Sequence, residues 1–314
     1  MDTTPAYFDT RARGKLLLTG EYFVLDGAEA LAMPVRYGQT LRVEPGEDAV
    51  LDWTSCEQDG MEWFRARFSL PGLLLQDTTD TQTATTLKSI LEACRRQKPA
   101  FLSGSGGIQV TTEVDFPRSW GLGTSSTLIA AMARWAGVDP YAVLFSTLGG
   151  SGYDVACAYA VGPLFYRLDD KVPQVQEASF RPGFSEGLYF VHLTQKQDSR
   201  EGIRHYRDRG MIDKTLIEEV SQLSRLFVQA ESIAELDRVI RQHEKVVSFV
   251  TELPRARDLY FGDFWGEVKS LGAWGGDFVL AMSAQAPDLV ADYFLKKGFS
   301  TCLAYQDMVV ASGR

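Results

Sequence analysis

The segment that most constrains the fold is Ser119–Trp135, SWGLGTSSTLIAAMARW, in which small residues lead directly into an apolar run. Gly121 and Gly123 precede three hydroxyl residues, Thr124–Ser126, and the run behind them has helical spacing. A glycine-rich loop at the start of a helix offers an anion its backbone N–H groups and the positive end of the helix dipole. A hydroxyl residue at this place can also simply cap the helix. The segment alone leaves both interpretations open.

Two further glycine-rich turns strengthen the anion-binding interpretation. The turn GGSGYDVA, Gly149–Ala156, places Asp154 at an expected helix start, where an acidic residue either caps the helix or takes part in catalysis. The turn SLGAWGGDFVLA, Ser270–Ala281, leads into an expected strand, and its glycines form either a tight turn or part of a nucleotide site. None of the three matches the common phosphate-loop signatures, because G-x-x-x-x-G-K-[ST] does not occur and the third glycine of G-x-G-x-x-G is missing.

Charge and cysteine usage exclude several classes of protein. The formal net charge of −9 argues against nonspecific nucleic-acid binding, which needs a basic face. The four cysteines form no C-x-x-C pair and the three histidines are dispersed, which argues against a disulfide framework and a zinc site. The first residues lack the pattern of a signal peptide, and no apolar run approaches the ~20 residues of a membrane span. We therefore expect a cytoplasmic protein with neither a membrane segment nor a nucleic-acid partner.

Hydrophobic periodicity predicts a mixed α and β chain in two lobes. The runs KLLL and YFVL on either side of TGE predict a strand, a turn and a second strand near the N-terminus. Residues 215–250 carry apolar residues at helical spacing, which predicts at least two amphipathic helices that either support a homodimer or cover the C-terminal sheet. A polar, proline-bearing segment at 170–185 predicts a domain boundary there.

The order of three motifs along the chain resembles that of the GHMP kinases, the family of galacto-, homoserine, mevalonate and phosphomevalonate kinases. RGKLLLTGEYFVLDGAEALAMPV resembles the first motif of the family, GLGTSSTL its central phosphate loop, and LGAWGGD its C-terminal glycine loop. The resemblance implies an α+β, two-lobed GHMP-kinase fold with a ribosomal-protein-S5-like N-terminal lobe and a ferredoxin-like C-terminal lobe. It places the ATP-binding lobe at residues 1–178 and the C-terminal lobe at 179–314.

The same resemblance implies an activity. The expected protein is a kinase that uses Mg²⁺ and ATP to transfer the γ-phosphoryl group to mevalonate or phosphomevalonate in isoprenoid precursor biosynthesis. The GEY and GGD segments look most like those of phosphomevalonate kinases, whereas GGSGYDVACA looks like a mevalonate-kinase-like branch, so the acceptor stays open. The alternatives are a non-catalytic ATP- or metabolite-binding homologue and a diphosphomevalonate decarboxylase.

Site residues follow from the resemblance position by position. Lys15 and Asp154 are the expected catalytic residues, the first as a cation for the transferred group and the second to orient or deprotonate the acceptor oxygen. The expected nucleotide-binding residues are Gly121, Leu122, Gly123, Thr124, Ser125, Ser126, Gly275 and Gly276. Ser126 and Glu21 are expected at the metal ion. The expected substrate-binding residues are Glu21, Tyr22, Ser151, Gly152, Lys196, Ser199 and Arg200.

Two departures from the family pattern concern the nucleotide and the metal ion. The chain has no Glu between Ser126 and Asp154, a region from which several family members supply a metal ligand. Trp274 replaces a glycine of the third loop, and a side chain of this size is expected to crowd the nucleotide or to cover the site.

Overall fold

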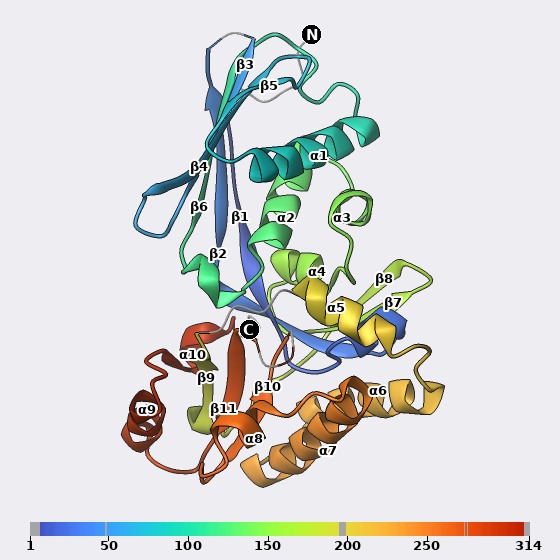
Figure 1. Cartoon of the computed structure of the whole chain (residues 1–314), viewed down its shortest axis with the longest axis vertical. Helices are drawn as coiled ribbons and strands as arrows, with labels where there is room; N and C mark the ends of the chain where they lie inside the picture. Colours follow the sequence, from blue (N-terminus) through green and yellow to red (C-terminus); the bar gives the residue numbers. More distant parts are fainter. Residues whose placement is uncertain (1–6, 48, 195–198, 273, 275, 311–314) are drawn as a thin grey trace. The chain divides into compact units, whose positions relative to one another are not determined.

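The computed structural model of the 314-residue chain describes residues 7–47, 49–194, 199–272, 274 and 276–310 (Figure 1). Its contacts divide the chain into two compact units that alternate along the sequence. Unit 1 comprises Met1–Gly14, Tyr37–Arg118 and Leu122–Tyr159, and unit 2 comprises Lys15–Arg36, Ser119–Gly121 and Ala160–Arg314. The boundary expected between residues 178 and 179 stays a prediction.

Unit 1 is a twisted sheet covered by helices. Its elements are β1 (Phe8–Leu17) and β2 (Ala30–Pro45), which both extend into unit 2, β3 (Val50–Cys56), β4 (Glu62–Ser69), β5 (Leu75–Thr78), α1 (Thr81–Gln97), β6 (Ile108–Val114), α2 (Thr124–Ala136), α3 (Pro140–Thr147) and α4 (Tyr153–Tyr159). The short helix η2 (Arg118–Trp120) begins at the last residue of a unit 1 segment and continues in unit 2. The strand order is β5-β4-β3-β6-β2, with β1 paired to β2, and only the β3–β6 pair is parallel among the strand pairs whose register is described here.

The alternation of side chains explains how this sheet buries one face. Phe64, Ala66 and Phe68 of β4 are buried, whereas Arg65 and Arg67 between them are turned toward solvent. The buried side chains join those of α1, α2 and α3 in one hydrophobic core. The core fixes the helices on the sheet and thereby the position of the glycine-rich loop before α2.

Unit 2 contains a four-stranded antiparallel sheet in the order β10-β11-β9-β12. Its elements are η1 (Phe23–Asp26), β7 (Leu164–Asp169), β8 (Val172–Glu177), η3 (Ser185–Gly187), β9 (Leu188–His192), α5 (Ser199–Asp208), α6 (Lys214–Gln229), α7 (Ile233–Thr251), α8 (Ala256–Tyr260), β10 (Glu267–Ser270), β11 (Phe278–Met282), α9 (Pro287–Lys296), β12 (Cys302–Ala304) and α10 (Tyr305–Met308). Strands β7 and β8 form a hairpin whose first strand pairs with the beginning of β2.

Hydrophobic clusters among the described residues hold unit 2 together. In the first, apolar side chains from one face of the sheet, among them Val191 and Val279, pack against Phe261 and against Phe294 of α9. In the second, α6 and α7 pack against each other and against the turn at Tyr22. The two amphipathic helices predicted between residues 215 and 250 are therefore confirmed as α6 and α7, and they cover parts of unit 2 (Figure 1). The homodimer stays a prediction.

Two expectations for local structure are wrong. The run YFVL is not a strand, because Phe23–Asp26 forms a 3₁₀ helix between two residues of positive φ, Tyr22 (61°) and Gly27 (86°). The run TCLAYQDMVV, whose apolar residues also predict a strand, is a strand only at Cys302–Ala304 and then continues as a helix, α10. In both runs apolar residues are buried by neighbours distant in sequence, so an apolar run did not distinguish a strand from a short helix.

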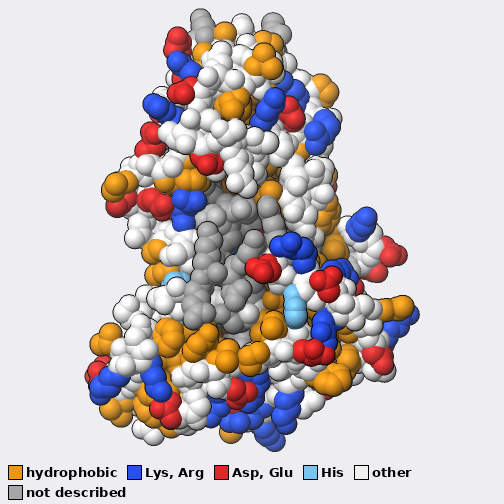
Figure 2. Space-filling model, in the orientation of Figure 1, with side chains coloured by type: hydrophobic (Ala, Val, Ile, Leu, Met, Phe, Trp, Pro, Cys, Tyr) orange, Lys and Arg blue, Asp and Glu red, His pale blue; other side chains and the backbone are white. Residues whose placement is uncertain are grey.

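In the part of the chain described above, no helix has both the length and the apolar character required to cross a membrane. On the face drawn in Figure 2, unit 2 exposes hydrophobic side chains between groups of Lys and Arg side chains.

Candidate phosphate-binding site

The start of the glycine-rich loop, Ser119–Gly121, is anchored to the sheet of unit 2. The imidazole Nε2 of His192 lies 3.1 Å from the carbonyl oxygen of Ser119. The Trp120 ring meets the Phe278 ring edge-on, with 5.6 Å between the ring centroids. Because His192 ends β9 and Phe278 begins β11, the paired strands hold the loop at two adjacent points.

Gly121 lies between a cation and a carboxylate. Lys15 donates a hydrogen bond from Nζ to the Gly121 carbonyl oxygen over 2.8 Å. A Cβ atom added to Gly121 would lie 1.6 Å from Oδ2 of Asp277, so the carboxylate contacts the same residue. Gly121 also has a φ of +63°, a conformation that side chains rarely adopt. The position therefore requires glycine, and the bond to Gly121 places Lys15 beside the loop, whereas its catalytic role stays a prediction.

Asp277 was missed by the sequence analysis, although it is the last residue of the GGD segment. Its backbone carbonyl accepts a hydrogen bond from the Leu193 N–H over 2.8 Å, which fixes it directly before the first residue of β11. The sequence signal was an acidic residue directly behind two glycines. Only the fold shows that this residue contacts the first glycine of the central loop.

The second half of the loop, in unit 1, forms the start of α2. The N-cap position is Gly123, with a φ of 95° and no side-chain capping bond, so the capping interpretation of Thr124 and Ser125 is not supported. The first N–H groups of a helix have no partner within the helix, and a glycine at the N-cap supplies no side chain to bond them. The buried Ser126 hydroxyl donates to the Gly123 carbonyl oxygen over 2.8 Å, whereas Ser125 is exposed.

The GGSGYD turn lies in unit 1 as well. Gly149, Gly150 and Gly152 all have positive φ, and the turn leads into α4, where Asp154 lies in the first turn. The Asp154 carboxylate accepts a hydrogen bond from the Val155 N–H through Oδ1 over 2.9 Å. Asp154 belongs to unit 1 and Lys15 to unit 2, so their pairing stays a prediction.

Glu21, expected at the metal ion or the substrate, lies fully buried in a cluster of charged groups in unit 2. Its Oε1 is 2.5 Å from Nζ of Lys269, which is also buried and lies 3.6 Å from Glu244 Oε1. Burial raises the pKa of Glu21, and the adjacent Lys269 partly offsets that shift. These contacts favour a structural role for Glu21, and its metal role stays a prediction.

His243 completes this cluster from α7. Its Nε2 accepts a hydrogen bond from the Gly20 N–H over 3.0 Å and lies 3.3 Å from Oε2 of Glu21. Burial and the positive charge of Lys269 lower the pKa of His243 well below its ordinary value, so the ring is neutral. Sequence reasoning missed His243, Glu244 and Lys269, because they lie on a helix and a strand without a motif of their own.

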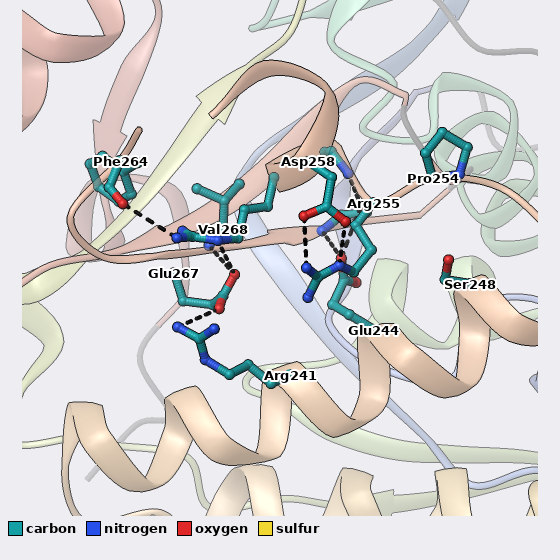
Figure 3. A network of polar contacts seen from close by, with 12 residues as sticks. Arg241, Glu244, Ser248, Pro254, Arg255, Asp258, Phe264, Glu267 and Val268 are labelled. Atoms are coloured by element: carbon teal, nitrogen blue, oxygen red, sulfur yellow. Dashed lines mark hydrogen bonds and ion pairs between the residues drawn. The ribbon is translucent and has the colours of Figure 1, made fainter. Parts of the chain in front are cut away.

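A second polar network lies beside this cluster (Figure 3). The buried Glu267 carboxylate lies 2.9 Å from an Arg241 nitrogen and 3.5 Å from Nε of Arg257. Arg255 and Asp258 form a bidentate pair over 2.8 and 2.7 Å. The network ties α7, α8 and β10 together, and thereby fixes the strand that carries Lys269.

Tyr22, expected at the substrate, has a strained backbone. Its φ of 61° and ψ of −44°, with a 2.7 Å hydrogen bond from the Phe23 N–H to the Glu21 carbonyl oxygen, describe a classic γ-turn. Such a conformation costs about 1–3 kcal/mol and persists only where its surroundings impose it. Here the Tyr22 ring stacks on the ring of Tyr206. The Tyr22 hydroxyl oxygen accepts a hydrogen bond from the backbone N–H of Trp274 over 3.0 Å.

Trp274 does not cover the site as expected. Its ring is 4 % exposed and packs among Tyr22, Val246 and Val250, and its Nε1 donates to the Pro254 carbonyl oxygen over 2.8 Å. The indole is therefore part of the core of unit 2.

Several expected site residues lie outside what the structure describes. These are Lys196 and Gly275, together with the side chains of Ser199 and Arg200, whose backbone begins α5. Gly276 and Ser151 are buried, and so is Leu122. No group of three or more His, Cys, Asp and Glu side chains within the described ranges is placed to hold a metal ion.

Comparison with known proteins identifies the fold. No protein-family model and no curated protein matches the sequence. Among solved structures, L. major mevalonate kinase in complex with R-mevalonate is similar over 100 % of both chains, with a TM-score of 0.71 and 16 % identity. The chain has the GHMP-kinase fold.

Two further structures of this fold are similar to the chain. Streptococcus pneumoniae phosphomevalonate kinase in complex with phosphomevalonate and AMPPNP covers 94 % of this chain and 99 % of its own, with a TM-score of 0.72 and 15 % identity. A mevalonate diphosphate decarboxylase from Legionella pneumophila covers 95 % of this chain and 100 % of its own, with a TM-score of 0.58 and 12 % identity. The predicted α+β GHMP-kinase fold is confirmed.

Proposed function

We propose that this chain is an ATP-dependent phosphotransferase that transfers the γ-phosphoryl group to mevalonate or phosphomevalonate. The observation that carries the proposal is the start of α2, where Gly123 occupies the N-cap position without a side-chain cap and Lys15 bonds the carbonyl of Gly121. A glycine-rich loop that leads into an uncapped helix start, with a lysine bonded to the loop backbone, supplies the N–H groups and the cation that a triphosphate needs. Support comes from similar structures that contain R-mevalonate in one case and phosphomevalonate with AMPPNP in the other.

The proposed division of roles follows from phosphoryl-transfer chemistry, which depends on positioning and charge neutralisation. The backbone of Gly121–Ser126 binds the phosphates, and Lys15 stabilises the negative charge that builds up on the transferred group. Asp154 orients the acceptor hydroxyl or takes its proton. Lys196, Ser199 and Arg200 bind the anionic end of the acceptor, since lysine and arginine suit carboxylate and phosphate groups.

The residues proposed around the phosphates fit Mg²⁺. The hydroxyl of Ser126 and the carboxylate of Asp154 are oxygen donors, the ligand class of this ion, which retains several waters in most protein sites. When bound, Mg²⁺ neutralises charge on the phosphate oxygens. Asp154 then has two roles open to it, as a ligand and as the group that orients the acceptor.

The test is an ADP-release assay with Mg²⁺ and ATP against mevalonate, phosphomevalonate, diphosphomevalonate, homoserine and galactose. Wild type is compared with Lys15→Met, Asp154→Asn and the surface control Lys88→Met, whose lysine pairs with Glu92 on α1. Turnover of one acceptor that is lost in the first two variants and retained in the control supports the proposal. ATP binding without turnover of any acceptor contradicts it and favours a non-catalytic ATP-binding protein.

Decarboxylation of diphosphomevalonate is a second candidate, because the Legionella pneumophila decarboxylase has the same fold. Release of phosphate and CO₂ from diphosphomevalonate distinguishes this reaction from phosphorylation of the other acceptors.

A further inference from the structure

The turn at Glu21 and Tyr22 is held from three sides within unit 2. Lys269 of β10 binds the Glu21 carboxylate over 2.5 Å and also donates to the Ser270 carbonyl oxygen over 2.8 Å. His243 of α7 accepts a hydrogen bond from the backbone N–H of Gly20, and the backbone N–H of Trp274 donates a hydrogen bond to the Tyr22 hydroxyl oxygen. The buried ion pair therefore lies directly next to the residue with the strained backbone.

Helix α5 packs against the ring of Tyr22. The ring stacks on Tyr206 of α5, with 5.5 Å between the centroids and 18° between the planes. Gly202 of the same helix approaches it so closely that an added Cβ would lie 2.5 Å from the Tyr22 hydroxyl oxygen. Arg207 of α5 binds Asp26 over 2.5 Å, in the 3₁₀ helix that follows the turn. A shift of the turn would therefore move α5 with it.

We propose that Lys269 is a positioning residue for the acceptor. Through its ion pair with Glu21 it holds the γ-turn at Tyr22, and the turn holds α5, whose first residues are Ser199 and Arg200. The acceptor part of this inference rests on the proposed function, which assigns the start of α5 to acceptor binding. The nucleotide loop, which is anchored separately through His192 and Phe278, keeps its shape when the ion pair is lost.

Two variants disturb this arrangement at different points. Lys269→Met keeps the length of the side chain and removes its charge, so that Glu21 loses its partner. Gly202→Ala leaves the ion pair intact and separates α5 from Tyr22, although alanine by itself favours a helix. Lys296→Met is the control, because this lysine of α9 forms only an exposed pair with Asp292.

The experiment compares KM for the acceptor, KM for ATP and amide hydrogen exchange in wild type and the three variants. We expect Lys269→Met and Gly202→Ala to raise the acceptor KM by about tenfold, with ATP KM changed by less than about twofold. We also expect amide exchange in α5 to become about tenfold faster than in wild type while exchange in α9 stays constant.

Equal acceleration of exchange in α5 and α9 would show that Lys269 acts on overall stability alone, and it overturns the inference. Unchanged exchange in α5 of folded Lys269→Met overturns it as well. If Lys269→Met does not fold, Gly202→Ala tests the second half of the chain of contacts, and unchanged exchange in α5 of this variant overturns the claim that the turn at Tyr22 holds the helix. If wild type phosphorylates none of the acceptors, the proposed function fails, and faster exchange confined to α5 still supports the positioning of this helix by Lys269.

Discussion

The carboxylate of Asp277 lies against the α-carbon of Gly121, so close that a Cβ on Gly121 would meet Oδ2 at 1.6 Å. Two of the three glycine-rich segments, the central loop and the GGD segment, are thus in direct contact although 156 positions separate the two residues (277 − 121). Since Lys15 from the first segment bonds the carbonyl of the same glycine, all three segments that carried the resemblance to GHMP kinases meet at Gly121.

Gly121→Ala is expected to impair nucleotide binding. The new methyl group collides with Asp277 and the residue leaves its φ of +63°, so the loop must change shape. We expect ATP KM to rise by about tenfold or more, measured by ADP release. Gly298→Ala is the matched control, because it also has positive φ (+93°) but no neighbour within 4 Å of the added Cβ. An equal rise in ATP KM in both variants would contradict the role of the contact with Asp277.

Glu244 is expected to make the stability of the protein fall as the pH rises. Burial raises its pKa to about 8, and Lys269 and Glu21 face it in the same cluster. Between about pH 5 and pH 8 the folded protein therefore keeps a proton that the unfolded chain, with a carboxyl pKa of about 4.3, has lost. The free energy of unfolding then falls by up to ~1.4 kcal/mol per pH unit in this range.

Glu244→Gln tests this dependence, because the amide has no proton to lose. Urea unfolding at pH 5, 6, 7, 8 and 9 should show a flatter stability profile for the variant than for wild type. The difference in stability between the two should grow up to about pH 8 and stay constant above it. Parallel profiles would contradict the raised pKa. Glu231→Gln, at an exposed position, serves as the control.

Ser126→Ala is expected to raise the Mg²⁺ concentration needed for half-maximal ADP release. The proposed site loses one of its oxygen donors, and a loss of about tenfold in apparent metal affinity is the expected order. Ser146→Ala is the matched control, since its hydroxyl also bonds a helix carbonyl, that of Ala142 over 2.7 Å, in α3. An unchanged Mg²⁺ requirement in Ser126→Ala would remove this residue from the proposed metal site.

Trp274→Ala is expected to lower stability and to leave nucleotide binding unchanged. The indole is buried in the core of unit 2, and truncation of a buried tryptophan costs about 3–5 kcal/mol. Urea unfolding measures the loss, and ATP KM of the folded variant should stay within about twofold of wild type. A clear fall in ATP KM would indicate that the ring obstructs the nucleotide, as its place in the sequence first suggested.

The sequence by itself determined the local features of this protein. Gly121 and Gly123 before an apolar run predicted the loop and the start of α2, because positive φ and helix initiation depend on neighbouring residues. The spacing of apolar residues predicted α6 and α7. The order of three short segments was sufficient for the GHMP-kinase fold, although overall identity to similar structures is only 12–16 %.

Only the tertiary structure decided what surrounds these segments. Glu21 looked like a carboxylate that binds the metal ion or the substrate, and the fold buries it against Lys269, 248 positions away, and against His243. The run after it looked like a strand, and a γ-turn at Tyr22 makes it a 3₁₀ helix. Such outcomes depend on desolvation and on charge partners that meet only after the chain has folded, and no local pattern of residues encodes them.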